Sequence, residues 1–292
     1  MKIILVLFSI LLGACGDAKD SRSGGMGGSN ALIKIQLSES IDKLLSESSE
    51  KFSKDCLPQV NMCWYKLNKP AADDSLPSVL VNKSLKIEHV TDVKASIDGD
   101  VGNDVENLEL MIRGLPDNSP HEENRALLYS LIKDIRAAGW EHYFAPYDPR
   151  ISGKQAEKIV ASGNVLGVYV KSHPWFDPEY EMNMEQWLKV DDFYDWNFYK
   201  AGDYLTLRAW RRSSDVAPKE KGTYLISFKF MTEREYWSSE FSKEEDKVRW
   251  VELLPDLLLK YKKQRSELES KIVEAGLEIN SDYKDPPIKA LK

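Results

Sequence analysis

The chain has 292 residues, of which 42% are hydrophobic and 30% are charged, and its formal net charge is −7. This composition is too apolar for a disordered chain and predicts a globular protein with one large or two modest cores. The acidic balance offers no basic surface to nucleic acid or to anionic lipid headgroups, so we expect no nucleic-acid partner.

The first fourteen residues have the layout of a secretory signal. One lysine precedes an apolar run from Ile3 to Leu12 that only Ser9 interrupts, and small residues follow it. The run is too short to span a bilayer as a stable helix. We therefore expect residues 1–14 to be a signal peptide.

The residues that end this signal are Leu12, Gly13, Ala14 and Cys15. At every position they resemble the lipobox of bacterial lipoproteins, and the resemblance covers only this N-terminal end. It implies cleavage before Cys15, lipidation of that cysteine, and attachment to the membrane by the lipid anchor only. Gly16 after the cysteine implies the outer membrane, with the protein facing the periplasm. An ordinary cleaved signal with an incidental cysteine is the alternative.

The next segment predicts a leash between anchor and body. Residues 16–30 contain five glycines and three serines and show no periodic apolar face. We expect the lipidated cysteine and leash to occupy residues 15–30, an α+β body to occupy 31–280, and residues 281–292 to be loosely held. Residues 31–100 could form a separate subdomain.

Two further cysteines, Cys56 and Cys63, predict a disulfide, because an even pair at short spacing in an exported protein forms one most simply. The chain-entropy model predicts that this disulfide would stabilise the folded protein by roughly 2 to 3 kcal/mol. Two cysteines with no histidine nearby are too few for a metal site, and free thiols are the alternative.

The body begins with a helix and two strands. Helical spacing from Ser38 onward predicts an amphipathic helix, and residues 31–37 fit either its beginning or a strand. Residues 79–81 and 85–90 read as strands, and 97–104 as a turn-rich connection.

Residues 107–147 predict a strand-helix-strand unit. Residues 107–113 alternate as a half-buried strand. Ser119, followed by proline and three residues later by Glu122, predicts a capping box for a helix that ends at Gly139. A strand near residues 142–147 completes the unit.

The second half predicts strands at 165–171, 204–212 and 223–231. A second capping box at Ser242 opens a long helix that Pro255 should kink or divide and that Gly276 should end. The expected fold is α+β, with an antiparallel or mixed sheet of five to six strands and a long kinked C-terminal helix packed on one face.

No catalytic motif of the zinc-protease, α/β-hydrolase or P-loop type occurs, so we expect no enzyme, cofactor or metal. The carboxylates between Asp177 and Asp203 lack the EF-hand spacing that a calcium loop needs. Only His173, with Asp177 four residues later, has a setting that could hold an alternative catalytic site.

The stretch DDFYDWNFY at residues 191–199 is the strongest signal for binding. Neither strand nor helix periodicity places all five aromatic side chains on one face, so we expect some of them to point outward. Aromatic residues dominate interface hot spots, and the aspartates would attract a basic partner. The predicted partner-binding residues are Asp192, Phe193, Tyr194, Asp195, Trp196 and Tyr199, with Tyr194, Trp196 and Tyr199 as the anchors.

An acidic, leashed lipoprotein with a disulfide and no catalytic motif is similar in design to the immunity lipoproteins that bacteria pair with type VI secretion effectors. The resemblance implies stoichiometric binding of a secreted antibacterial toxin in the periplasm. The alternatives are a cell-envelope enzyme or glycan-binding lipoprotein that acts on cell-wall material, and a scaffold subunit of an envelope machine.

Overall fold

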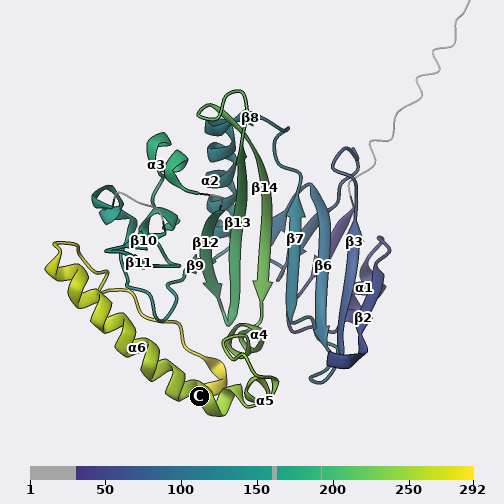
Figure 1. The fold of residues 1–292 in the computed structure, drawn as a ribbon. Coiled ribbons are helices and arrows are strands. Elements are labelled where there is room, and N and C mark those ends of the chain that lie inside the picture. The colour runs from purple at the N-terminus through teal and green to yellow at the C-terminus, as the bar shows by residue number, and fades with distance from the viewer. Residues whose placement is uncertain (1–30, 160–162, 192) are drawn as a thin grey trace, which may run out of the picture.

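The computed structural model describes residues 31–159, 163–191 and 193–292. These residues form an α+β fold built on a nine-stranded antiparallel sheet, with a long helix near the C-terminus (Figure 1). The expected signal peptide, Cys15 and the leash lie outside the described residues, as does Asp192.

The large sheet has the order β2-β3-β6-β7-β14-β13-β12-β9, with β8 paired to β14. It has more strands than the five to six we expected, because residues 53–57, 62–68 and 193–200 and most of 90–98 were not predicted as strands. The strands are β2 (Ser53–Leu57), β3 (Met62–Asn68), β6 (Val90–Asp98), β7 (Asn107–Ile112), β8 (Ser119–Pro120), β9 (Glu141–His142), β12 (Phe193–Lys200), β13 (Asp203–Ser213) and β14 (Lys221–Met231).

A three-stranded sheet lies at the start of the body. It consists of β1 (Leu32–Ile35), β4 (Ser78–Val81) and β5 (Leu85–Ile87), with β1 parallel to β4. Helix α1 (Ile41–Glu47) follows β1 and begins at Ser40, whose hydroxyl accepts a hydrogen bond from the Asp42 amide. Residues 31–37 are therefore a strand and a turn rather than part of this helix.

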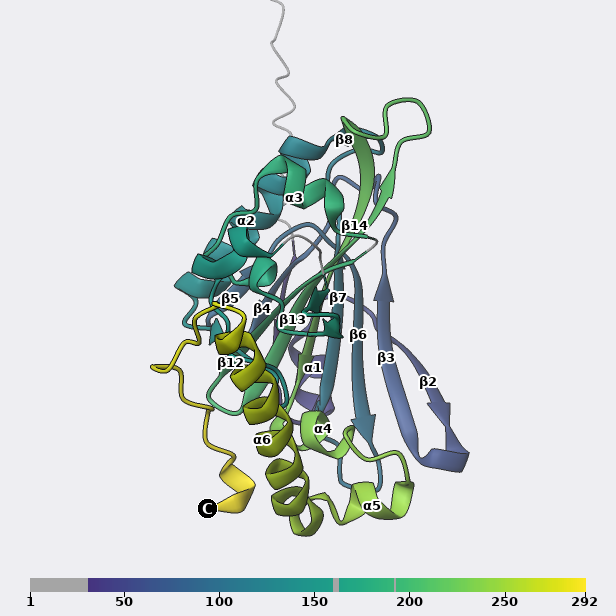
Figure 2. The same cartoon turned by 60° about the vertical axis from the view of Figure 1, so that its left-hand side comes forward.

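Helix α2 (His121–Ala137) lies on one side of the large sheet (Figure 2). It ends as expected: Gly139 has a φ of +86°, and the Trp140 amide bonds back to the carbonyl of Ile135. The expected capping box is wrong, because Ser119 pairs with Gly222 in the sheet and its hydroxyl donates to the Pro116 carbonyl.

One hydrophobic core joins both sheets and α2. Trp196, Leu207, Phe228, Leu110 and Val93 occupy one row across five neighbouring strands, and all five are buried. Buried side chains of residues 31–100 belong to the same cluster as those of the later strands. The N-terminal third thus shares the core of the whole body.

The C-terminal helices differ from expectation in where the chain divides. The helices are α4 (Glu233–Ser238), α5 (Glu244–Val248) and α6 (Trp250–Glu274). The break falls at Arg249, and α6 continues through Pro255. Val251, whose carbonyl loses its amide partner at Pro255, is 41% exposed, so water can replace that partner. Ser242 does not cap α5, and Val248 is exposed.

Helix α6 does not lie across a face of the large sheet, as we had expected. It packs against α4, α5 and residues 143–159 and 163–170, beside the β9 end of the sheet (Figure 1). Residues 281–292, expected to be loose, make contacts with both α6 and α4. Asp285 pairs with Arg265 at 2.7 Å, and the amides of Lys289 and Ala290 bond to the carboxylate of Glu233.

The segment between α2 and β12 is irregular. The strand expected at 165–171 is a small hairpin, because Leu166 and Gly167 adopt positive φ angles of +50° and +77° and reverse the chain. Between α2 and β12 the chain also forms η2 (Gly153–Lys158), the two strands of this hairpin, β10 (Asn164–Val165) and β11 (Val168–Tyr169), then η3 (Pro174–Phe176) and α3 (Met184–Lys189). Two further 3-10 helices lie outside this segment: η1 (Pro58–Val60) and η4 (Lys289–Leu291). Among the described residues, none of the helices combines the length and apolar character needed to cross a bilayer.

Candidate functional site

The predicted disulfide is confirmed. Cys56 on β2 and Cys63 on β3 are bonded and face each other as cross-strand partners. The bond closes the end of an edge hairpin, where Leu57 at the end of β2 and Val60 in the turn η1 are half-exposed. The disulfide stabilises the pairing of β2 with β3, because the sequence of β2 by itself has little strand character.

The aromatic run at 193–199 forms most of β12, and strand alternation sorts its side chains. Tyr194, Trp196 and Phe198 point into the core and are fully buried. The expectation that Tyr194 and Trp196 lie on the surface as partner anchors is therefore corrected. Their rings stack with each other and with Trp187 of α3, because α3 covers this part of the sheet.

A buried arginine explains why these polar aromatic residues are tolerated inside. Arg211 of β13 donates hydrogen bonds to the carbonyls of Trp187 and Val190 at 2.9 and 2.6 Å. It also donates to the Tyr194 hydroxyl at 2.7 Å, and that hydroxyl donates to the Trp187 carbonyl. These bonds fasten the end of α3 to the sheet, so the run has a structural role there.

The other side of β12 faces outward at the start of the strand, while Asn197 farther along is buried. Phe193 is 49% exposed, and Asp195 forms a two-pronged ion pair with Arg208 at 2.7 Å. The guanidinium of Arg208 also lies over the Phe193 ring, 5.1 Å from its centroid. The ion pair with Arg208 offsets the negative charge of Asp195, which we had expected to attract a basic partner. Tyr199 is half-buried and bonds to the Pro287 carbonyl.

Phe193 belongs to an exposed apolar surface, here called the aromatic patch. Phe193 faces Trp210, and Trp210 faces the exposed Leu225 on β14. Tyr169 of the β10–β11 hairpin lies near this row, since the charges of Asp195 and Arg208 act on its hydroxyl. The patch comprises Tyr169, Phe193, Trp210 and Leu225.

Tyr169 is the most exposed aromatic side chain of the patch, at 71%. Sequence reasoning missed it, because the segment 165–171 looked like a strand with one buried face. Partial burial, together with the neighbouring carboxylate of Asp195, raises the pKa of its phenol above the usual value. Like an ordinary tyrosine, the phenol is neutral at physiological pH and can donate a hydrogen bond to a partner.

In the structure, His173 and Asp177 do not form the pair that we had considered as an alternative catalytic site. His173 is buried, and its Nδ1 accepts a hydrogen bond from the Trp175 amide at the start of η3. Asp177 accepts hydrogen bonds from the amides of Gly153 and Glu179. The histidine found beside Asp177 is His142, whose Nδ1 lies 3.7 Å from its carboxylate.

His142 and Asp177 line a cavity of about 370 Å³ together with Lys154, Glu179 and Tyr283. Burial lowers the pKa of His142 to about 4, although Asp177 opposes this shift, so the imidazole is neutral near pH 7. A separation of 3.7 Å is too long for the hydrogen bond that would orient a catalytic base. The pair is 35 positions apart in sequence, which hid it from motif reading.

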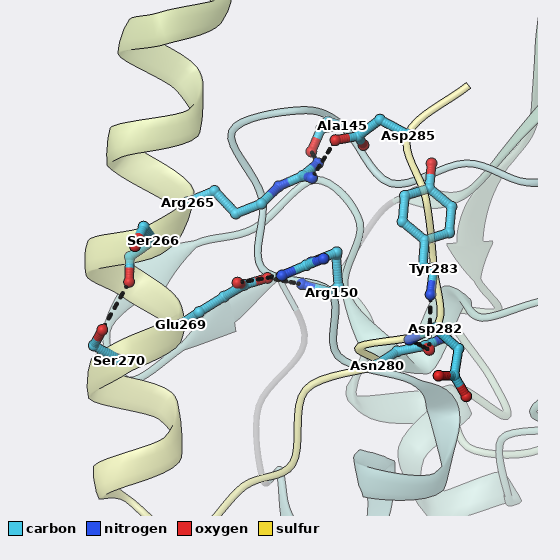
Figure 3. Close-up of polar contacts among 10 residues, drawn as sticks. All are labelled: Ala145, Arg150, Arg265, Ser266, Glu269, Ser270, Asn280, Asp282, Tyr283 and Asp285. Carbon is cyan, nitrogen blue, oxygen red and sulfur yellow. Dashed lines mark hydrogen bonds and ion pairs between the residues drawn. The ribbon is translucent and has the colours of Figure 1, made fainter. Parts of the chain in front are cut away.

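A larger cavity, of about 540 Å³, lies between α6 and the C-terminal segment, and we call it the α6 cavity. Figure 3 shows Arg265 and Glu269 reaching from α6 toward the segments opposite. Its lining comprises Tyr143, Pro146, Arg150, Trp237, Leu258, Lys262, Arg265, Ser266, Glu269, Asp285, Pro286, Ile288 and Leu291.

Two ion pairs brace the walls of the α6 cavity (Figure 3). Arg150 donates to both oxygens of Glu269 at 2.8 Å, while Arg265 donates to Asp285 at 2.7 Å and to the Ala145 carbonyl at 2.9 Å. Burial raises the pKa of Glu269, but the hydrogen bonds and charge of Arg150 outweigh it and leave the pKa below its usual value.

Throughout the described ranges, no group of three or more histidine, cysteine or acidic side chains could hold a metal ion. A scan against protein-family models and searches of curated proteins and of solved structures found no match.

Proposed function

We propose that this chain is a membrane-tethered protein of the periplasm that binds a protein partner through the aromatic patch. The observation that carries this proposal is the row of exposed Phe193, half-buried Trp210 and exposed Leu225, with the exposed Tyr169 near it. Isolated exposed apolar residues are common, but a group with three aromatic side chains and charged neighbours is typical of an interaction surface.

The partner we propose is a secreted antibacterial toxin, which the chain neutralises as an immunity protein by stoichiometric binding. The patch supports this because its strands are held rigidly by the sheet, so little conformational entropy is lost on binding. A lipid on Cys15 would keep the inhibitor close to the membrane and raise its local concentration there. The partner should present a neutral, apolar surface, because Arg208 already compensates the charge of Asp195.

A cell-envelope enzyme or glycan-binding lipoprotein is the second candidate. The cavity beside His142 and Asp177 favours it, since a buried acid and a histidine share one opening there. The exposed ring of Tyr169 could also stack on a sugar.

The proposal is tested with residues 16–292, oxidised and without lipid, as bait in an envelope lysate of the source bacterium. The immunity function predicts one protein retained at a stoichiometric level, which is toxic when exported to the periplasm and harmless when the chain is exported with it. Retention of cell-wall fragments instead would support the glycan-binding candidate, and a retained protein without toxicity would contradict the immunity function.

A further inference from the structure

The α6 cavity has one apolar end and one polar end. Trp237 and Leu258 belong to the hydrophobic cluster around α4, and Ile288 and Leu291 of the C-terminal segment line the same cavity. The polar end is formed by the ion pairs of Arg150 and Arg265. From Leu258 to Glu269 the helix advances eleven residues, which is about 16 Å along its axis.

The polar half carries an excess of positive charge. Arg150, Lys262 and Arg265 provide three cations against the two carboxylates of Glu269 and Asp285. Within the described residues, Lys262 has no ion-pair partner. The remaining side of the Arg150 guanidinium, its Nη1, makes no hydrogen bond to any described residue. The cavity thus differs in the sign of its charge from the chain as a whole, whose net charge is −7.

Lys262 and Ser266 lie four residues apart on α6, so they project from the same side of the helix. Both side chains are exposed and line the cavity, so they can donate hydrogen bonds to a ligand there. The cavity thus presents free donors beside the ion pairs and an apolar wall farther along. A volume of about 540 Å³ is within the range of small-molecule sites.

We propose that the α6 cavity binds a single-chain anionic amphiphile. Its acyl chain lies against Trp237, Leu258 and Ile288, and its carboxylate or phosphate head accepts hydrogen bonds from Lys262 and Ser266. The apolar wall supplies affinity through burial of the chain, and the excess cation selects the anionic head over a neutral one. The α6 cavity shares no residue with the aromatic patch, so the test of this ligand does not depend on the proposed protein partner.

The test is titration of the oxidised, lipid-free chain with 11-bromoundecanoate below its micelle concentration. Trp237 lines the cavity, so a bromine on the chain should quench part of the tryptophan fluorescence with a saturable curve. The neutral 11-bromoundecanol should bind at least tenfold more weakly. Competition then distinguishes the two head groups: undecanoate and an alkyl phosphate of equal length are each used to displace bromoundecanoate. If the phosphate displaces it at the lower concentration, the head group of the ligand is a phosphate; if undecanoate does, it is a carboxylate.

Lys262→Gln and Lys263→Gln form a matched pair of variants. Lys262 lines the cavity, whereas Lys263 is the next residue, lies 3.9 Å from Glu267 and does not line the cavity. Lys262→Gln should weaken binding of bromoundecanoate about tenfold and leave bromoundecanol unchanged, and Lys263→Gln should change neither. Ile288→Asp should weaken both probes. Equal binding by the acid and the alcohol, equal effects of the two lysine variants, or no saturable quenching would overturn the proposal.

Discussion

Arg211 and Tyr194 are joined by a 2.7 Å hydrogen bond from the guanidinium to the phenol, and both side chains are buried. This bond links β13 to β12, and further bonds of Arg211 reach the carbonyls at the end of α3. The aromatic side chains of β12 therefore lie on two faces of the strand. Those on the buried face hold α3 in place, and Phe193 on the other face belongs to the aromatic patch.

Replacing Arg211 with leucine should destabilise the fold by about 3 kcal/mol, because the carbonyls of Trp187 and Val190 lose a buried donor. Urea unfolding followed by circular dichroism measures the loss. Arg212→Leu is the control: Arg212 is exposed and should change the free energy of unfolding by less than about 0.5 kcal/mol. Equal effects of the two variants would show that the carbonyl contacts contribute nothing.

Loss of the disulfide should also lower stability. The Cys56–Cys63 bond spans a sequence separation of seven, for which the chain-entropy model gives about 2.5 kcal/mol. The double variant Cys56→Ala/Cys63→Ala should therefore unfold at lower denaturant, and a reductant should destabilise only the parent. Equal midpoints for the oxidised parent and the double variant would refute this stabilisation.

Asp148 predicts a distinctive pH dependence. It is 2% exposed, and burial raises its pKa to about 6, while the hydrogen bond from the Ser172 amide opposes the shift. Because the folded pKa lies above the unfolded value near 3.8, the unfolded chain releases this proton first as pH rises. The contribution of Asp148 to stability is therefore complete below about pH 4 and is lost between about pH 4 and 6.

Asp148→Asn removes this titration. The free energy of unfolding of the variant, relative to the parent, should rise by about 3 kcal/mol from pH 4 to pH 7. Chemical denaturation at several pH values gives the difference, in which the contributions of other groups cancel. A difference that stays constant with pH would mean that Asp148 ionises normally in the folded protein.

Sequence patterns predicted the regular parts of this fold well. The strands predicted at residues 204–212 and 223–231 are found as β13 and β14, because a regular alternation of apolar and polar residues over many positions is typical of a strand and not of a helix. The helix end at Gly139 followed from local backbone chemistry. β2 was missed because its sequence, SKDCL, has no apolar alternation, and its strand exists through pairing with β3.

The candidate sites depended on contacts that no local pattern encodes. The density of aromatic residues at 191–199 indicated an unusual segment, but only the register with β13 decides that Phe193 points outward and Trp196 inward. Tyr169 joins the patch from a hairpin 24 positions earlier. The approach of His142 to Asp177 likewise arises from tertiary packing.

The claim that the aromatic patch is the partner surface predicts the effect of Tyr169→Ser/Phe193→Ser. Both side chains are exposed, so the double variant should keep the parent's unfolding midpoint while losing most of its partner affinity. Val248→Ser/Leu259→Ser is the matched control, since it removes two exposed apolar side chains of α5 and α6 that lie outside the patch.

The most direct measurement compares the retained envelope protein on three baits side by side: the parent, the patch variant and the control variant. We expect a stoichiometric band on the parent and the control, loss of at least nine tenths of it on the patch variant, and failure of that variant to protect cells from the toxin. Equal retention and protection by all three would contradict the assignment of the patch, and no retained protein on the parent would contradict the binding function itself.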